Sequence, residues 1–383
     1  MNNDISFIPL GGGQRVGASC YYLRIGDRNV ILDAGIGKED GMEFTPDFYS
    51  LITSPFMQSM GQINQIFISH AHMDHVGYLL QLMKQTYHSS VYMTEITKAL
   101  AEYQLYDRSF VGNGDINEAC RLATRNLLEK IATVSYMQSI DFGKYKVTFY
   151  PAGHIPGAMM MLFEKEKRKI LYTGDYSLEE TALTPGCIFP DEMNIDTVIM
   201  CGLHAKHPKY IKKSEAIFKQ AEDVLRFVNE SRQPVMCQIP QLSKGLEFLK
   251  ILNDRNSYGI PIYIDQSIMK IVMKMEHLSV SVLNQWNRKM RDERPRESHI
   301  YMTSDRNSRW RKGYRNIRVD FSLHEDFAEM KSFIRKINPR QAVIVHCEKE
   351  YSKFDRTIEQ EMMLDGENRT QFIFAEENEI YRL

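Results

Sequence analysis

Four side chains that can bind metal ions lie within six consecutive residues of this chain: His70, His72, Asp74 and His75. They follow an apolar run, 66–68, that predicts a buried strand. Alternate side chains of an extended segment point the same way, so the first two histidines can bind one ion, while the next two ligands follow at a turn and can face a second. Imidazole and carboxylate are the ligands that zinc and similar metals favour. Two such ions roughly 3.5–4 Å apart form a site that hydrolyses phosphodiesters and similar bonds.

The alternative is a polar loop that caps a helix and contains histidines by chance, but other parts of the chain repeat the pattern. His154 follows a strand expected at 146–150, Asp175 one at 169–172, and His346 an apolar strand at 341–345. A core histidine with satisfied hydrogen bonds is the commoner explanation for His154 alone, whereas the repetition favours metal binding. Asp33 also ends a predicted strand, where it either orients a metal-bound histidine or is an ordinary turn aspartate.

The spacing of apolar residues predicts an α/β protein in which a second domain is inserted into the first. Helices are expected at 78–88, 94–106 and 116–132, and strand–helix alternation over 212–267 predicts a smaller α/β unit. The expected boundaries are 1–207 and 306–383 for the two parts of the first domain and 208–305 for the inserted domain.

The composition describes an ordinary globular protein of 383 residues, with 43% hydrophobic and 25% charged residues and a formal net charge of −1. The overall charge therefore does not indicate a polyanionic partner. The six cysteines are widely separated and form no Cys-x-x-Cys motif, as is typical of reduced thiols in a cytosolic protein. With no signal peptide and no apolar stretch long enough for a bilayer, we expect a cytoplasmic protein without a membrane partner.

The motifs resemble those of metallo-β-lactamase-fold nucleases that carry a β-CASP insertion, such as bacterial ribonuclease J and the pre-mRNA 3′-end cleavage endonuclease. Asp33 is similar to the first family motif and Ser69–His75 to the second. The third, fourth, β-CASP and last motifs are similar to Ala152–Ala158, Tyr172–Ser177, Phe321–Asp326 and Val343–Glu348. The last two similarities point to nucleic acid rather than to a small ester or lactam.

The resemblance implies a metallo-β-lactamase αβ/βα sandwich with an inserted β-CASP-like α/β domain, and two divalent ions, zinc or alternatively manganese. One ion would take His70, His72 and His154, the other Asp74, His75 and His346, and Asp175 would bridge them. The resemblance also implies catalytic roles for Asp74, Asp175 and His324. His324 would protonate the departing oxygen or bind the phosphate; otherwise it is a residue that starts a helix and bonds to backbone.

Two departures from the family pattern concern the catalytic histidine and the substrate channel. Cys201 stands where the family has an acidic residue that can orient His324, and a thiol cannot replace a carboxylate in that role. His204 or His207 could take over that role, but the preferred interpretation is that both are ordinary polar loop residues. The segment between the strand at 300–302 and His324 is also shorter than the family's, which implies a more open or differently gated channel.

This short segment is the most basic part of the chain. Its candidate nucleic-acid contacts are Arg306, Arg309, Trp310, Arg311, Lys312, Tyr314 and Arg315. Basic side chains bind phosphates, and aromatic faces stack on unpaired bases at ~1–3 kcal/mol each. The alternative is a solvated surface, because acidic residues interrupt the run.

The leading interpretation is a metal-dependent phosphodiesterase for single-stranded nucleic acid, with RNA favoured over DNA. One rival is a hydrolase of small esters, thioesters or lactones that uses the same site. The other is a non-catalytic partner subunit in RNA processing. The sequence leaves open whether cleavage is internal or starts from a 5′ end, which metal is used in the cell, and whether the chain forms homo-oligomers.

Overall fold

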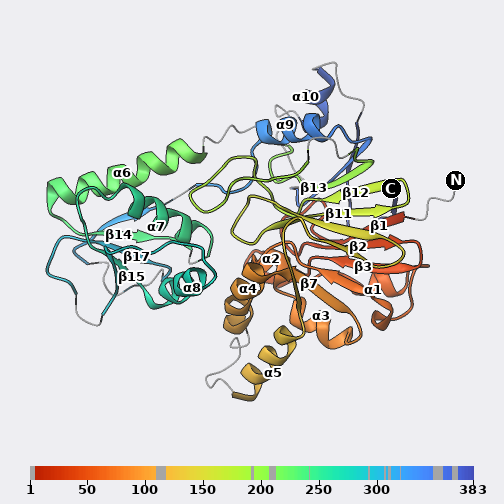
Figure 1. Cartoon of the computed structure of the whole chain (residues 1–383), viewed down its shortest axis with the longest axis horizontal. Helices are drawn as coiled ribbons and strands as arrows, with labels where there is room; N and C mark the ends of the chain where they lie inside the picture. The colour runs from red at the N-terminus through yellow and green to blue at the C-terminus, as the bar shows by residue number, and fades with distance from the viewer. Residues whose placement is uncertain are drawn as a thin grey trace. The chain divides into compact units, whose positions relative to one another are not determined.

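A computed structural model describes most of the chain: residues 5–108, 118–190, 194–206, 213–240, 242–291, 294–305, 308, 312–319, 321–347, 357–364 and 370–383. The chain forms two compact units (Figure 1). Unit 1 consists of Met1–Leu178, Gly186–Tyr210 and His324–Leu383, and unit 2 of Glu179–Pro185 and Ile211–Leu323.

Unit 1 is built on two seven-stranded sheets. The first has the order β21 (Tyr381–Arg382), β1 (Ile5–Gly11), β2 (Cys20–Ile25), β3 (Arg28–Leu32), β6 (Gln65–Phe67), β7 (Ser90–Thr94) and β8 (Ala132–Val134). The second has the order β20 (Gln371–Phe374), β19 (Gln341–Val345), β13 (Thr197–Cys201), β12 (Arg168–Tyr172), β11 (Met159–Lys165), β10 (Lys146–Pro151) and β9 (Ser139–Asp141). Unit 1 also contains a small separate hairpin of β4 (Gly37–Glu39) and β5 (Met42–Phe44).

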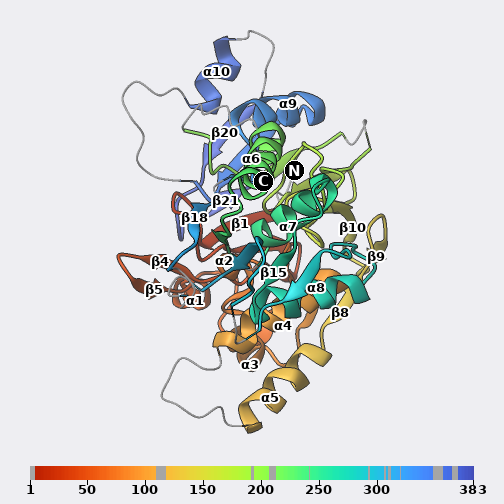
Figure 2. The ribbon, with the colours of Figure 1, turned by 90° about the vertical axis from the view of Figure 1, so that its left-hand side faces the viewer.

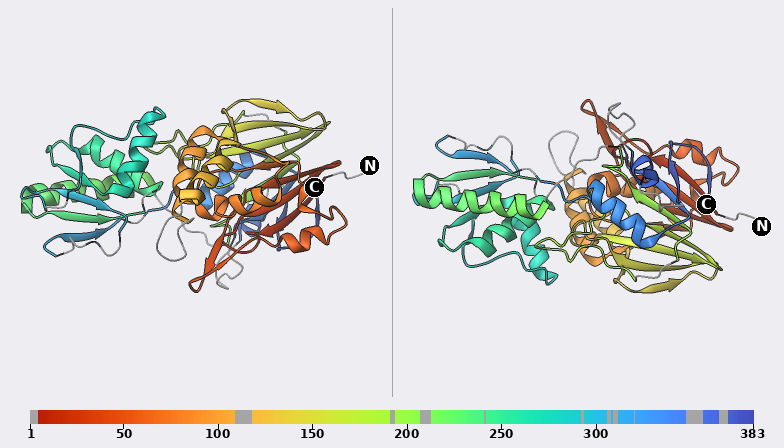
Figure 3. Two further views of the ribbon diagram at one scale, coloured as in Figure 1. Left: turned by 90° about the horizontal axis from the view of Figure 1, so that it is seen from below. Right: turned by 90° about the horizontal axis from the view of Figure 1, so that it is seen from above.

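The two sheets pack face to face and enclose the core of unit 1 (Figure 3). Phe67 of the first sheet meets Phe149 and Phe163 of the second at ring-centroid distances of 6.1 and 5.6 Å. Tyr21 and Tyr172 form a further pair across the layers at 5.7 Å. Burial of such large aromatic side chains dominates core energetics, so these contacts hold the sheets together.

Helices cover the outer faces of this sandwich (Figure 2). On one side lie α1 (Phe48–Ile52), α3 (Leu79–Gln85), α4 (Glu95–Arg108) and α5 (Glu118–Glu129), with the short η1 (Met60–Gln62) and α2 (Met73–Val76) in the connections; on the other lie α9 (Phe327–Ile337) and α10 (Ile358–Leu364). A capping box between Asp326 and Glu329 starts α9, and Asn338 ends it with a φ of 40°. The order of layers is therefore helix, sheet, sheet, helix.

Unit 2 is a five-stranded, all-parallel sheet with helices. Its strand order is β16 (Asn287–Lys289), β15 (Ile262–Ile264), β17 (Ile300–Thr303), β14 (Val235–Gln238) and β18 (Arg315–Arg318), and its helices are α6 (Lys213–Ser231), α7 (Lys244–Arg255) and α8 (Gln266–His277). The unit extends past the boundary expected at 305, because β18 pairs with β14.

The observed elements differ from the expected ones mainly in short strands. The helix expected at 116–132 ends at Glu129, and residues 132–134 form β8 beside β7. The edge strands β9, β16, β18, β20 and β21 were not expected, because two to four residues give too little alternation to recognise. In the part of the chain that the structure describes, no helix is both long and apolar enough to cross a membrane.

Glu247 on α7 gives unit 2 a pH-dependent stability. Its carboxylate is buried and accepts hydrogen bonds from the Ala182 backbone N–H and the Thr181 hydroxyl. Burial outweighs these bonds and raises its pKa from 4.5 to about 7. The folded state therefore holds this proton more tightly than the unfolded chain. The contribution of this group to the free energy of unfolding is fully present below pH 4.5. It is lost as the pH rises through 7, which lowers the free energy of unfolding by roughly 3 kcal/mol.

We expect Glu247→Gln to remove most of this pH dependence, because the amide cannot ionise. Urea unfolding of both proteins at pH 5 and pH 8, followed by a signal from unit 2, measures the change. The exposed Glu230→Gln on α6 is the matched control. Equal loss of stability between these pH values in wild type and Glu247→Gln would contradict the assignment.

Candidate metal centre

The candidate ligands lie at one edge of the two sheets, where several strands end. Asp33 follows β3, His70 follows β6, Asp175 follows β12 and His346 follows β19. In the first sheet β3 pairs in parallel with β6, and in the second β13 pairs in parallel with both β12 and β19. Carboxyl ends of parallel neighbours share an edge, and this brings ligands distant in sequence together.

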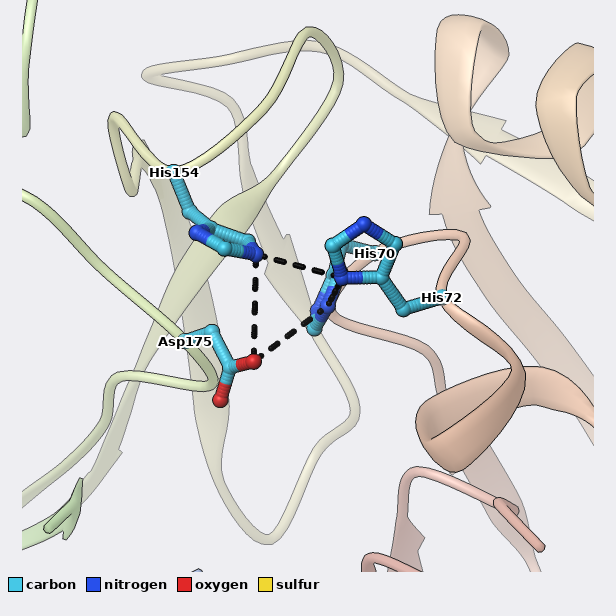
Figure 4. Close-up of side chains that lie close together, drawn as sticks. All are labelled: His70, His72, His154 and Asp175. Carbon is cyan, nitrogen blue, oxygen red and sulfur yellow. Dashed lines mark hydrogen bonds and ion pairs between the residues drawn. The ribbon is translucent and has the colours of Figure 1, made fainter. Parts of the chain in front are cut away.

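The first cluster comprises His70, His72, His154 and Asp175 (Figure 4). His72 Nδ1 lies 3.1 Å from His70 Nε2 and 3.2 Å from His154 Nε2. Asp175 Oδ2 lies 3.6 Å from His70 Nε2 and 3.8 Å from His154 Nε2. Three ring nitrogens and one carboxylate oxygen therefore converge on one point.

The second cluster comprises Asp74, His75 and His346. Asp74 Oδ2 lies 4.0 Å from His75 Nε2 and 3.8 Å from His346 Nε2. Asp175 Oδ2 lies 3.4 Å from His75 Nε2, so this one oxygen faces both clusters. The seven side chains expected from the sequence as ligands thus form two adjoining groups with Asp175 between them.

The spacing of these atoms fits divalent ions. Nitrogen and oxygen ligands about 2.0–2.2 Å from a tetrahedral ion lie roughly 3.3–3.6 Å from one another. The distances of 3.1 to 3.8 Å in the first cluster bracket that range, and those of 3.4 to 4.0 Å in the second are slightly wider. The donor set of imidazoles and carboxylates is the one that zinc accepts.

Asp33 is placed to orient the second cluster. Its buried carboxylate accepts a hydrogen bond from the His75 ring at 2.8 Å, which makes Nδ1 the protonated nitrogen and turns the Nε2 lone pair toward the cluster. It also accepts bonds from the Ser69 backbone N–H at 2.6 Å and the Tyr172 hydroxyl at 2.5 Å. The carboxylate is therefore fixed from three sides.

Two serines that the sequence analysis did not identify orient further ligands. Ser69 donates its only hydroxyl proton to Asp33 at 2.7 Å, so toward His70 Nδ1, at 3.0 Å, it acts as an acceptor and leaves Nε2 for the cluster. The Ser19 hydroxyl lies 2.9 Å from His346 Nδ1 and is fully buried. Only Ser69 had a signal in the sequence, its position directly before His70.

The backbone at this edge is strained where it turns the ligands inward. Asp33 and His346 have positive φ angles of 59° and 51°, a conformation that costs roughly 1–3 kcal/mol in a residue other than glycine. Gly153 precedes His154 with a φ of 78°, and a Cβ atom there would lie 2.4 Å from backbone atoms of Ser177 and Cys187. Such strain persists only where surrounding packing enforces it, as at functional sites.

Charges in the clusters favour binding of cations. Burial, and next the charge of His75, lower the pKa of His70 well below its ordinary value, and burial also lowers that of His72. Burial acts against a charged Asp175 as well, but neighbouring histidines outweigh it and hold its pKa well below the ordinary value. Neutral imidazoles and an ionised carboxylate are the forms that bind metal. His75 is the exception: burial acts against its charged form, but Asp175, Asp33 and Asp74 outweigh burial and raise its pKa well above the ordinary value, so this ring would release a proton when an ion binds.

His324 lies beside the first cluster. Its ring centroid is 4.4 Å from that of His154, and its Nδ1 is 3.5 Å from Asp175 Oδ2. Burial, aided by the other histidines, lowers its pKa well below the ordinary value despite the charge of Asp175. Cys201, the last residue of β13, joins Asp175 and His324 in a third group of ligating atoms that lie within 4.8 Å of one another.

Some of the predicted nucleic-acid contacts lie outside the described residues: Arg306, Arg309, Trp310 and Arg311. Lys312 and Arg315 are exposed in unit 2, and the Arg315 guanidinium lies 4.1 Å from the centre of the Phe227 ring. Tyr314 does not offer the stacking surface expected of it. Its side chain is buried, its hydroxyl bonds to His299, and Arg294 covers its ring at 4.6 Å.

Comparison with known families gives two matches along the chain. Residues 13–223 match the metallo-beta-lactamase superfamily, and residues 313–366 match the zinc-dependent metallo-hydrolase RNA specificity domain. A crystal structure of a protein of unknown function from Enterococcus faecalis has a similar fold, with a TM-score of 0.66 and 13% identity over 99% of this chain and 100% of that one.

The chain is also similar to longer proteins. Over 72% of its length it is 32% identical to cleavage and polyadenylation specificity factor 73 of Drosophila melanogaster, of which it covers 40%. It is 27% identical to RNase aCSPSF2 of Saccharolobus solfataricus (67% of this chain, 50% of that protein) and to endoribonuclease YSH1 of Gibberella zeae (78% and 36%). The chain thus spans at most half the length of these relatives.

Proposed function

The chain belongs to the metallo-beta-lactamase superfamily, and we propose that it is a metal-dependent ribonuclease that uses two ions to hydrolyse phosphodiester bonds. The membership confirms the predicted fold class and the resemblance drawn from the motifs. The observation that carries the proposal is the convergence of seven ligands in two groups around Asp175. Names of similar proteins, and the RNA specificity model at 313–366, support RNA as the substrate.

The proposed roles follow from the two clusters. His70, His72 and His154 would hold one ion, Asp74, His75 and His346 would hold the other, and Asp175 would contribute to both. When bound, a pair of divalent ions lowers the pKa of a water toward neutrality and offsets charge that builds on phosphoryl oxygens. We favour zinc on the donor set, with manganese as the alternative.

The chain's own residues supply orientation and proton transfer. Asp33, Ser69 and Ser19 hold ligand rings with one nitrogen turned toward the clusters. Nδ1 of His324 lies 3.5 Å from Asp175 Oδ2, and we propose that Nε2 is the nitrogen that meets the substrate. We assign to this nitrogen the donation of a proton to the departing oxygen.

Unit 2 is proposed to be the inserted β-CASP-like domain and to contribute RNA contacts from Lys312 and Arg315, which are exposed. The cytoplasmic location expected from the sequence stays a prediction. A hydrolase of small esters, and a non-catalytic partner subunit, remain the rival functions. The second rival predicts lost ligands, whereas this chain has a ligand at all seven positions.

The proposal predicts that the metal-loaded protein cuts single-stranded RNA and that removal of metal by a chelator stops the reaction. A time course on end-labelled linear RNA and on circular RNA, with zinc or manganese, measures this. Cleavage of the circle identifies internal cutting, because a circle has no end to start from. Hydrolysis of generic esters or thioesters without cleavage of either RNA would contradict the proposal and favour the first rival.

A further inference from the structure

A third group of metal-ligating atoms adjoins the two proposed ion sites in unit 1. The Cys201 sulfur, the His324 ring and the Asp175 carboxylate lie within 4.8 Å of one another. His324 Nδ1 lies 3.5 Å from Asp175 Oδ2, the oxygen that also faces both other clusters. A carboxylate has two oxygens, and Oδ1 of Asp175 is buried with no hydrogen bond among the described residues, so Oδ1 is the oxygen left for this group.

A second buried carboxylate adds negative charge to this group. Glu325 is fully buried, and its backbone N–H donates to the Tyr176 carbonyl at 2.9 Å. Burial, followed by the charges of Glu325 and Asp175, raises the pKa of the Cys201 thiol. The Asp175 carboxylate is buried as well, and a buried charge is costly unless opposite charge is nearby, which a cation at this point would provide.

We propose that Cys201, His324 and Asp175 form a third cation site that selects zinc through its sulfur ligand and, when occupied, inhibits the enzyme. Thiolate ligands select zinc and other soft ions over manganese and magnesium. When the Zn–S bond forms, the thiol proton is released to solvent. Repulsion from two adjacent dications makes this site the weakest of the three, so it fills only when zinc is in excess.

Inhibition follows from the identity of the ligands and rests on the proposed ribonuclease function. The group includes His324, to which proton donation is assigned. Zinc bound to Nδ1 would take the place of the proton there, so the ring could not form the imidazolium that donates a proton from Nε2. Excess zinc would therefore slow RNA cleavage, whereas excess manganese would not.

Binding is tested without any activity measurement by titrating the metal-free protein with Co²⁺ and recording its absorption spectrum. We expect no thiolate-to-cobalt charge-transfer band during the first two equivalents and such a band with the third. Cys201→Ser should lose the band, and Cys237→Ser, a control at a buried cysteine of β14 in unit 2, should keep it. A band that appears with the first equivalents, never appears, or survives in Cys201→Ser would overturn the site.

Zinc inhibition is then tested on RNA, with each variant's rate expressed relative to its own rate at two equivalents of zinc. Excess zinc should slow the wild type about tenfold and Cys201→Ser less than about twofold, as expected for loss of a ligand. Glu325→Gln should weaken binding of the third cobalt ion, because it removes a charge but keeps the side-chain volume. Equal inhibition of wild type and Cys201→Ser would overturn the inhibitory role. If no variant cleaves RNA, the proposed function fails, and the cobalt titration still decides the site.

Discussion

Replacing either His72 or Asp74 by alanine is expected to lower RNA cleavage at least ~10³-fold, because each change removes a ligand from a different ion. An ion contributes several kcal/mol of transition-state stabilisation, and 1.36 kcal/mol corresponds to a tenfold change in rate. Both side chains are only partly buried, unlike His70 and Asp175, so their removal leaves the core intact.

Metal analysis should separate the two variants. His72→Ala is expected to lose the ion of the first cluster and Asp74→Ala the ion of the second, so each binds about one ion fewer than the wild type after dialysis at fixed free zinc. His88→Ala and Asp40→Ala change exposed residues of the same types in unit 1 and are the controls. Folded variants that keep full activity and full metal content would exclude the two clusters as the catalytic site.

The grouping of the candidate metal ligands could be predicted from the sequence because their residue types are rare and their places in the fold are regular. Each of His154, Asp175 and His346 follows a recognisable apolar strand, and these three strands run in the same direction, so they end at one edge of the sheet. The two-layer sandwich follows from the same strands, whose buried faces meet across the core.

The residues that orient the ligands could not be predicted, because serine and tyrosine are common and their partners are distant in sequence. Ser19 and His346 are separated by 327 positions, and Tyr172 and Asp33 by 139. Tyr314 is a residue for which the sequence suggested a role in RNA stacking that its buried position does not suit. An aromatic residue in a basic run suits either a stacking surface or a small core, and here it packs with Met236 and Tyr301.

His324→Ala is expected to lower RNA cleavage ~10²–10⁴-fold while both ions stay bound, the range typical for loss of a general acid. The ring faces Asp175 through Nδ1 and lies against His154, yet it belongs to neither proposed ligand set. Burial lowers its pKa, but a bound phosphodiester brings negative charge beside the ring, and opposite charge favours the protonated form. Binding of the substrate would thus raise the pKa of His324 and favour the protonated ring that donates the proton.

The leaving group distinguishes proton donation from phosphate binding by His324. Nitrophenolate is a leaving group that departs from a phosphodiester without needing a proton. His324→Ala should therefore lose far less activity on a nitrophenyl phosphodiester than on RNA. If the residue instead binds the phosphate, the loss is similar on both substrates, because both carry the same phosphoryl oxygens. His88→Ala, an exposed histidine of unit 1, is the matched control and should change neither rate more than about twofold, as is usual for surface substitutions. Equal losses on the two substrates would move His324 from proton transfer to substrate binding and leave the two-ion centre as the sole source of leaving-group activation.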